Sequence, residues 1–244
     1  MQLDLALLKA EKLVKRYHGK PVVDKVSIEL SDQSIVGLLG PNGAGKTTTF
    51  YMIAGLIPAD EGVVYLNNED ITRLPLHKRA RKGITYLPQE TSVFRRLSVA
   101  DNIRLVLELK GFSGNDLEDR MRELLDEMDL AGIADQQASS LSGGQQRRVE
   151  VLRSLATDPE FILLDEPFAG VDPLAISDLQ QIIRRLRDRG IGVFISDHNV
   201  REILTVCDHA YIVNSGVVIE QGNPDHIASS DIARKIYLGE DFRL

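Results

Sequence analysis

Apolar and polar residues alternate in the first part of the chain, and the spacing becomes helical near the middle. Alternation over residues 6–36 is typical of antiparallel strands with one polar face, and residues 63–66 with the Asn67-Asn68 turn fit the same sheet. Residues 95–158 are mostly helical in pattern. The residues there that share one helical face are Leu117, Met121, Leu124, Leu125 and Met128.

The second half of the chain alternates strand, helix and strand. Apolar runs at 161–164 and 191–195 flank a helical pattern, which predicts a parallel sheet. The helix between them has a plausible N-cap at Asp172, a proline directly after it, and Gly190 beyond its last turn. Residues 211–219 are typical of a hairpin around an Asn-Ser-Gly turn.

A glycine-rich loop follows the apolar run 35–39 and precedes a helical pattern at 47–54, where it has the form G-x-x-x-x-G-K-T. Its glycines allow backbone N–H groups to converge on phosphates, Lys46 supplies positive charge, and the Thr47 hydroxyl is left for Mg²⁺. The alternative is a glycine-rich turn with an incidental lysine. The predicted nucleotide contacts are Gly40, Pro41, Asn42, Gly43, Ala44, Gly45, Lys46, Thr47 and Thr48.

Composition narrows the class of protein only slightly. The 244 residues suffice for a sizeable core, and the net charge of −7 without a polybasic tract argues against nucleic acid as the main partner. The single cysteine, Cys207, suits a reducing compartment. We expect no signal peptide at residues 1–5, and no run approaches the ~20 apolar residues that span a bilayer. Any membrane role therefore requires a partner.

Two carboxylates end the apolar run 161–164, and in a parallel sheet this end of a strand faces the ligand. Asp165 is placed to hold Mg²⁺ through water, and Glu166 to accept a proton from the attacking water. The alternative is the start of an ordinary loop. The phosphate loop in the same chain favours the catalytic interpretation.

His198 follows another predicted core strand, and Gln89 ends a further one, residues 84–89, which a proline halts. A neutral imidazole at His198 would bridge the γ-phosphate and the catalytic carboxylate, and the Gln89 amide would bind Mg²⁺ or the attacking water. The alternatives are a histidine that caps a helix and a glutamine in a turn.

A second anion site is predicted at residues 141–145. Ser142 caps a following helix, and Gly143 and Gly144 leave its first N–H groups open. With the motifs above, this Leu-Ser-Gly-Gly-Gln stretch resembles the ATP-binding cassette ATPases over nearly the whole chain. The resemblance implies an α/β phosphate-loop NTPase fold with a RecA-like parallel core, an antiparallel β-subdomain and an inserted helical subdomain. We expect one domain, 1–244, with the helical part at about 90–158 and a hairpin and tail at about 205–244.

The resemblance also implies how the sites are assembled. In this family the second anion site faces the γ-phosphate on another subunit; here it consists of Ser142, Gly143, Gly144 and Gln145. Since this chain has one copy of each motif, two complete sites require a homodimer. Tyr17 should stack on adenine, although it is alternatively a strand aromatic that packs on the sheet. Asp172 lies where the family links its two sites, but Gly-Val-Asp replaces the usual Ser-x-Leu-Asp form, which puts that link in doubt.

Within this family, several stretches look like the ATPases of bacterial lipopolysaccharide export systems. They include residues 74–77, 86–90, 94–99 and 197–202, and the C-terminus 237–244, where chemistry does not force a match. Gln145 departs from the Glu common in that group. Branched-chain amino acid importers share several stretches, so the substrate rests on analogy. A soluble cassette ATPase, such as an iron–sulfur assembly factor, is the rival from another class.

Phe94, followed by two arginines, lies where the family places its groove for a membrane subunit. The alternative is a core phenylalanine. We therefore expect an Mg²⁺- and ATP-dependent ATPase that is a homodimer under two integral membrane subunits bound near Phe94. The expected location is the cytoplasmic face of the inner membrane, with no direct contact to lipid or nucleic acid.

Overall fold

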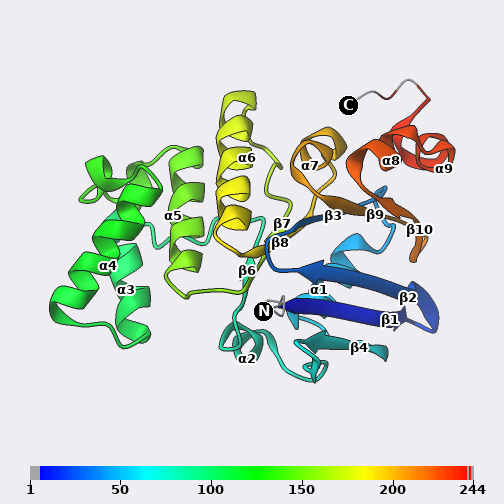
Figure 1. Cartoon of the computed structure of the whole chain (residues 1–244), viewed down its shortest axis with the longest axis horizontal. Coiled ribbons are helices and arrows are strands. Elements are labelled where there is room, and N and C mark those ends of the chain that lie inside the picture. The colour runs from blue at the N-terminus through cyan, green and yellow to red at the C-terminus, as the bar shows by residue number, and fades with distance from the viewer. Residues whose placement is uncertain (1–5, 241, 243–244) are drawn as a thin grey trace, which may run out of the picture.

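The computed structural model describes residues 6–240 and 242, and contains two β-sheets with helices between and around them (Figure 1). The smaller sheet has the order β2-β1-β4-β5 and is antiparallel. Its strands are β1 (Leu7–Tyr17), β2 (Lys20–Ser31), β4 (Glu61–Leu66) and β5 (Glu69–Asp70). The predicted antiparallel strands, including residues 63–66, are confirmed.

The larger sheet has the order β10-β9-β3-β8-β7-β6, and all its pairs are parallel except the terminal β9–β10 hairpin. Its strands are β3 (Ile35–Leu39), β6 (Ile84–Leu87), β7 (Phe161–Asp165), β8 (Gly192–Ser196), β9 (His209–Asn214) and β10 (Val217–Gly222). Every residue of β3, β7 and β8 is buried, as expected for strands covered on both faces.

Helices cover the two faces of the larger sheet unequally. Helix α1 (Lys46–Ala54) lies between the two sheets, where Phe50 stacks on Phe194 with ring centroids 5.1 Å apart. On the other face lie α5 (Gly143–Leu155), α6 (Pro173–Asp188) and α7 (Val200–Val206), whose apolar residues share a second core with the sheet (Figure 1). The Asp172 side chain caps α6 by accepting the Ala175 N–H at 3.1 Å, as predicted.

A helical region extends from one end of the larger sheet, at the left of Figure 1. It contains α3 (Val99–Leu109), α4 (Gly114–Glu127), the short 3₁₀ turns η1 (Ala131–Ile133) and η2 (Ala138–Ser140), and α5. The predicted stripe on α4 is buried. At the other end, α8 (Pro224–Ser229), α9 (Asp231–Ala233) and the π-turn η3 (Arg234–Leu238) follow the hairpin. Residues 241, 243 and 244 of the predicted tail lie outside the described residues.

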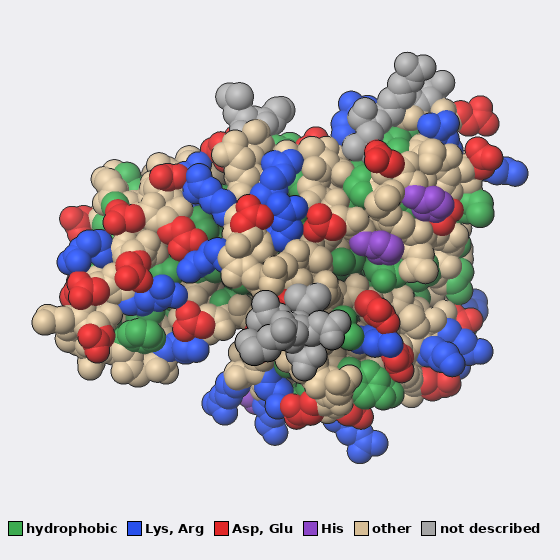
Figure 2. Space-filling model, in the orientation of Figure 1, with side chains coloured by type: hydrophobic (Ala, Val, Ile, Leu, Met, Phe, Trp, Pro, Cys, Tyr) green, Lys and Arg blue, Asp and Glu red, His purple; other side chains and the backbone are tan. Residues whose placement is uncertain are grey.

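Charged side chains of both signs are interspersed over the face of the molecule drawn in Figure 2, with no broad patch of a single sign. Among the described residues, no helix combines the length and the apolar character needed to span a bilayer.

A buried arginine caps the C-terminal end of α1 by hydrogen bonds to its last carbonyl groups. Arg79, on α2 (Leu76–Ala80), donates from Nη1 to the carbonyl oxygens of Met52 at 3.0 Å and Ile53 at 2.5 Å. Its Nε and Nη2 donate to Leu74 O at 2.8 Å and Thr72 O at 2.9 Å. Burial lowers the pKa of Arg79 to about 10, which leaves it protonated at neutral pH. The cation therefore holds the end of α1 opposite the phosphate loop.

Replacing Arg79 by methionine should destabilise the fold. Four hydrogen bonds from three guanidinium nitrogens to main-chain carbonyls would be lost. We expect a loss of roughly 3–5 kcal/mol and a fall in Tm of about 10 °C. Arg81→Met, at an exposed neighbour on the same turn, is the control and should melt like the wild type. A wild-type melting temperature for Arg79→Met would contradict the capping role.

Candidate nucleotide-binding and catalytic site

The phosphate loop, residues 40–47, connects the buried end of β3 to α1 and is held closely against its neighbours. Gly40 and Gly45 have φ of 146° and 100°. A Cβ would lie 2.0 Å from the Val213 carbonyl oxygen at Gly40, and 2.6 Å from that of Val22 at Gly45. Gly43, also at positive φ, faces open space. Glycine is thus required where the loop meets the hairpin β9–β10 and strand β2.

Lys46, the first residue of α1, folds back over this loop. Its Nζ donates to the carbonyl oxygens of Gly40 at 2.6 Å and Pro41 at 3.0 Å. Burial lowers the pKa of Lys46, while the nearby carboxylates of Glu166 and Asp197 act in the opposite direction. The ammonium is therefore directed into the loop, beside the two carboxylates. Thr47 is exposed at the start of α1, where N–H groups without helical partners favour an anion.

Asp165 and Glu166 lie at the carboxyl end of β7, one buried and one partly exposed. The Asp165 Oδ2 accepts a hydrogen bond from the Tyr86 hydroxyl at 3.1 Å. Burial raises the pKa of Asp165, and the bond from Tyr86 opposes that rise. Glu166 has φ of 43°, and its N–H donates to the Ser196 carbonyl at 2.6 Å. With this left-handed backbone at Glu166, the Asp165 carboxylate faces Tyr86 and the Glu166 carboxylate faces His198.

His198 lies next to Glu166, as the sequence predicts. Its Nδ1 is 3.5 Å from Glu166 Oε2 and 3.4 Å from Asp197 Oδ1. The imidazole is half-exposed, so it remains accessible to a ligand at the edge of the sheet. The structure thus brings the predicted bridging histidine next to the predicted catalytic carboxylate.

Asp197 was not among the predicted site residues. It is fully buried, and its two carboxylate oxygens accept the N–H of Phe168 at 2.8 Å and of Asn199 at 2.9 Å. It therefore fixes the segment after Glu166 to the segment that carries His198. The signal in the sequence was a carboxylate between an apolar strand and a candidate histidine.

Ser142 begins α5 with a reciprocal cap. The Ser142 Oγ accepts the Gln145 N–H at 3.3 Å, and the Ser142 N–H donates to the Gln145 side chain at 3.0 Å. Gly143 and Gly144 lie in the first turn, and a Cβ at Gly143 would meet only open space. The predicted helix start is confirmed.

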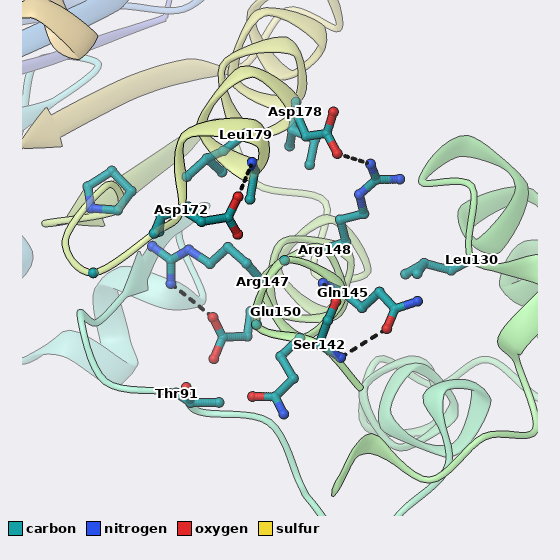
Figure 3. Close-up of a pocket in the computed structure, with 18 of the residues that line it drawn as sticks. Thr91, Leu130, Ser142, Gln145, Arg147, Arg148, Glu150, Asp172, Asp178 and Leu179 are labelled. Atoms are coloured by element: carbon teal, nitrogen blue, oxygen red, sulfur yellow. Dashed lines mark hydrogen bonds and ion pairs between the residues drawn. The ribbon is translucent and has the colours of Figure 1, made fainter. Parts of the chain in front are cut away.

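This helix start opens into a cavity of about 780 Å³, shown in Figure 3. Its lining includes residues 142–145, Gln89, Glu166 and Asp172. Gln89 follows β6, which ends at Leu87, two residues earlier than the sequence suggested. No residue of the loop 40–48 lines the cavity in the described part of the chain. Ser142 therefore lines this cavity and the described phosphate loop does not.

Tyr17 is 46% exposed at the end of β1, and the Lys15 Nζ lies 5.7 Å from its ring centroid. Tyr17 pairs with Lys20 at the turn between β1 and β2. Strand β2 then lies against the phosphate loop, because the Val22 carbonyl packs next to Gly45. The ring does not pack in the core, and its hairpin reaches the phosphate loop.

The fold and this site define a phosphate-loop NTPase. A family model described as ABC transporter matches residues 23–169. The chain belongs to the ABC transporter family, as an ATP-binding and ATP-hydrolysing subunit.

Two curated relatives and one solved structure support this assignment. The Escherichia coli K12 protein named lipopolysaccharide export system ATP-binding protein LptB is 54% identical over 241 residues, covering 98% of this chain and 100% of the relative. A Haemophilus influenzae protein of the same name is 51% identical over 241 residues, with the same coverage. The ADP conformation of an ATP-binding cassette of an ABC transporter superposes with a TM-score of 0.85 at 30% identity, covering 96% of this chain and 99% of that chain.

Proposed function

We propose that this chain is the ATPase subunit of a lipopolysaccharide export transporter. The observation that carries the proposal is 54% identity over 98% of the chain to a protein of that name. Recovery of lipopolysaccharide-transporting membrane proteins with the tagged chain from a membrane extract is the test. Recovery of amino acid importer subunits, or of soluble iron–sulfur assembly proteins, would replace the proposal with one of the alternatives.

The phosphate loop and the start of α1 bind the triphosphate. Backbone N–H groups of residues 40–45, all except Pro41, which has no N–H, surround the phosphates. The Lys46 ammonium exchanges its bonds to the Gly40 and Pro41 carbonyls for bonds to phosphate oxygens. The Thr48 side chain, half-buried on the first turn of α1, contributes a further contact. Tyr17 stacks on adenine, which its exposed ring permits.

The residues near the phosphates also suit Mg²⁺. Thr47, Gln89 and Asp165 offer hydroxyl, amide and carboxylate oxygens, the donors that this hard cation prefers. The hydrogen bond from the Tyr86 hydroxyl to Asp165 Oδ2, at 3.1 Å, favours the ionised carboxylate that a metal ion would require. When bound, the ion neutralises charge on the phosphates.

Hydrolysis is assigned to Glu166, His198 and Gln89. Glu166 accepts the proton of the attacking water, and His198, whose Nδ1 is 3.5 Å from Glu166 Oε2, bridges this carboxylate and the γ-phosphate. Gln89 positions the same water from the neighbouring strand. Asp197 keeps His198 and Glu166 in register through its two backbone bonds.

Each complete site requires two chains. The start of α5, with Ser142, Gly143, Gly144 and Gln145, presents N–H groups to the γ-phosphate on the second copy. The cavity at the start of α5 is not lined by the chain's own loop 40–48, which supports this arrangement. The homodimer closes on ATP and opens after hydrolysis, and Asp172, which lines the same cavity, lies near the subunit boundary.

Two integral membrane subunits dock around Phe94, which places the dimer on the cytoplasmic face of the inner membrane. The Phe94 ring is 43% exposed, although its backbone is fixed by both an N–H and a carbonyl bond to the buried Asn102 side chain, at 3.0 and 3.1 Å. An exposed aromatic on a rigid backbone favours an interface over the core alternative.

Phe94→Ala should separate assembly from folding. Loss of an interface aromatic commonly costs about 2 kcal/mol or more, roughly thirtyfold in affinity, so recovery of the membrane subunits should fail. The ATPase activity and Tm of the isolated protein should remain near those of the wild type. Leu109→Ala, at a side chain that is 82% exposed in the same helical region, is the control and should assemble normally. An early melt of Phe94→Ala would return Phe94 to the core.

A further inference from the structure

Three side chains on one face of α5 hold the segment 88–94. They are Arg147, Glu150 and Arg153, spaced three residues apart, so they lie along the same side of the helix. The segment contains both Gln89, assigned to the reacting water, and Phe94, assigned to docking. The same helix begins at Ser142. Helix α5 thus connects three parts of the protein: the segment with Gln89, the docking residue Phe94, and the anion site that begins at Ser142.

Glu150 is the central member of the three. Its side chain is only 4% exposed, and its two oxygens have different partners. Oε1 accepts the Ser92 N–H at 2.5 Å and lies 3.4 Å from the Ser92 hydroxyl. Oε2 accepts a hydrogen bond from Nη1 of Arg147 at 2.9 Å (Figure 3). The same Nη1 donates to the Pro88 carbonyl oxygen at 3.2 Å. A single carboxylate therefore connects the segment to its own helix.

Arg153 holds the other end of the segment. Its Nη1 donates to the Ser92 carbonyl at 2.6 Å, and its guanidinium carbon lies 4.4 Å from the Phe94 ring centroid. Burial lowers the pKa of Arg153, and Glu150 opposes this shift. Both backbone polar groups of Ser92 are therefore bound by α5, next to the aromatic ring.

Apart from Glu150, Arg147 has one hydrogen-bond partner among the described residues, the Pro88 carbonyl. Its Nε and Nη2 atoms are buried without a hydrogen-bond partner, so Glu150 is its one ion-pair partner among the described residues. A buried cation left without a counter-charge is strongly unfavourable. Changing Glu150 should therefore displace Arg147 as well as Ser92, and with them Pro88 and Gln89.

We propose that Glu150 is a positioning residue that fixes segment 88–94 to the helix beginning at Ser142, so that a partner docked on Phe94 alters the placement of Gln89 and Ser142 together. This deepens the proposed docking function and rests on it for the role of the partner. The part that concerns Gln89 and Ser142 rests only on the chain's ATPase activity. Because α5 is a rigid element of 13 residues, a shift at Arg153 is carried to its first turn.

Glu150→Gln in the isolated ATPase tests the first part. Gln keeps the shape and can accept the Ser92 N–H, but it provides no charge for Arg147. We expect kcat to fall ~10-fold while KM for ATP stays within about twofold, because the phosphate loop makes no contact with this cluster. Glu118→Gln, which removes an exposed carboxylate paired with Arg104, is the matched control and should keep wild-type kcat.

A purely structural role is tested separately. Val149→Ala makes a cavity on the same helix one residue away, at a fully buried side chain, and should lower Tm without lowering kcat at temperatures well below the melt. Equal losses of kcat in Val149→Ala and Glu150→Gln would overturn the positioning role, as would wild-type kcat in Glu150→Gln. If Glu150→Gln does not fold, Arg147→Gln, which removes the other half of the ion pair, takes its place. The same fall in kcat is then expected, and wild-type kcat would overturn the positioning role.

The transporter assembled in nanodiscs tests the second part. With Phe94 intact, Glu150→Gln should still recover the membrane subunits, but its kcat should no longer change on assembly as that of the wild type does. A normal response would overturn the coupling role. Failure of the wild type itself to assemble would count against the proposed function, while the kcat of the isolated Glu150→Gln would still decide the positioning of Gln89 and Ser142.

Discussion

Glu166→Gln should bind ATP with wild-type affinity and lose ~10²–10⁴ of its turnover, the usual contribution of a general base. The substitution preserves side-chain shape, and the N–H bond from residue 166 to Ser196 does not depend on the side chain. The loss should therefore be chemical. With hydrolysis blocked, ATP should hold the dimer closed, so the variant should elute as a dimer only in the presence of ATP.

Phosphate release measures the turnover, and size-exclusion chromatography with and without ATP measures the dimer. Glu160→Gln is a suitable control because Glu160 directly precedes the same strand, β7, at the end opposite Glu166, where its carboxylate bonds Asn67 at 3.2 Å. It should hydrolyse ATP like the wild type. Wild-type turnover in Glu166→Gln would remove this carboxylate from the mechanism.

Ser142→Arg should lower turnover steeply without affecting ATP binding by the monomer. A bulky cation would fill the start of α5, whereas residues 40–48 of the same chain line no part of that cavity. We expect turnover to fall by ~10²-fold or more, comparable with the loss of a group that stabilises transition-state charge. Ser142→Ala isolates the loss of the cap, which costs about 1 kcal/mol of helix stability, and should retain much more activity.

Mixing two inactive variants distinguishes a composite site from a site within one chain. In a mixed dimer of Ser142→Arg with Lys46→Ala, one site combines the intact phosphate loop of the first chain with the intact Ser142 of the second. Activity should therefore reappear on mixing, although neither variant is active alone. If mixing restores nothing and Ser142→Arg alone hydrolyses ATP normally, the two-chain site is wrong.

Local patterns were sufficient to predict the main elements and much of the site. Alternation identified β1 and β2, and continuous apolar runs identified β3, β7 and β8, because burial on one or two faces leaves these signatures directly in the sequence. The caps at Ser142 and Asp172 were also predictable, since a cap bonds to a residue three positions away. The structure brings His198 next to Glu166, as adjacent parallel strands require.

The residues that sequence reasoning missed act over long separations along the chain. Asp197 binds the backbone at Phe168, Arg79 binds the end of α1, and Glu150 binds Ser92, each more than twenty residues away. No periodicity reports such contacts, because a buried polar residue in a helix or at a strand end resembles a surface residue in sequence.

The positive φ of Glu166 affects the balance between folding stability and activity in this enzyme. A side chain in the left-handed region at φ of 43° is less stable than glycine there by about 1 kcal/mol. A chain selected for stability alone would place glycine at this turn and would have no base. The proposed general base is thus retained against the conformational preference of its own peptide unit, and we expect its replacement by glycine to remove the base and to stabilise the fold.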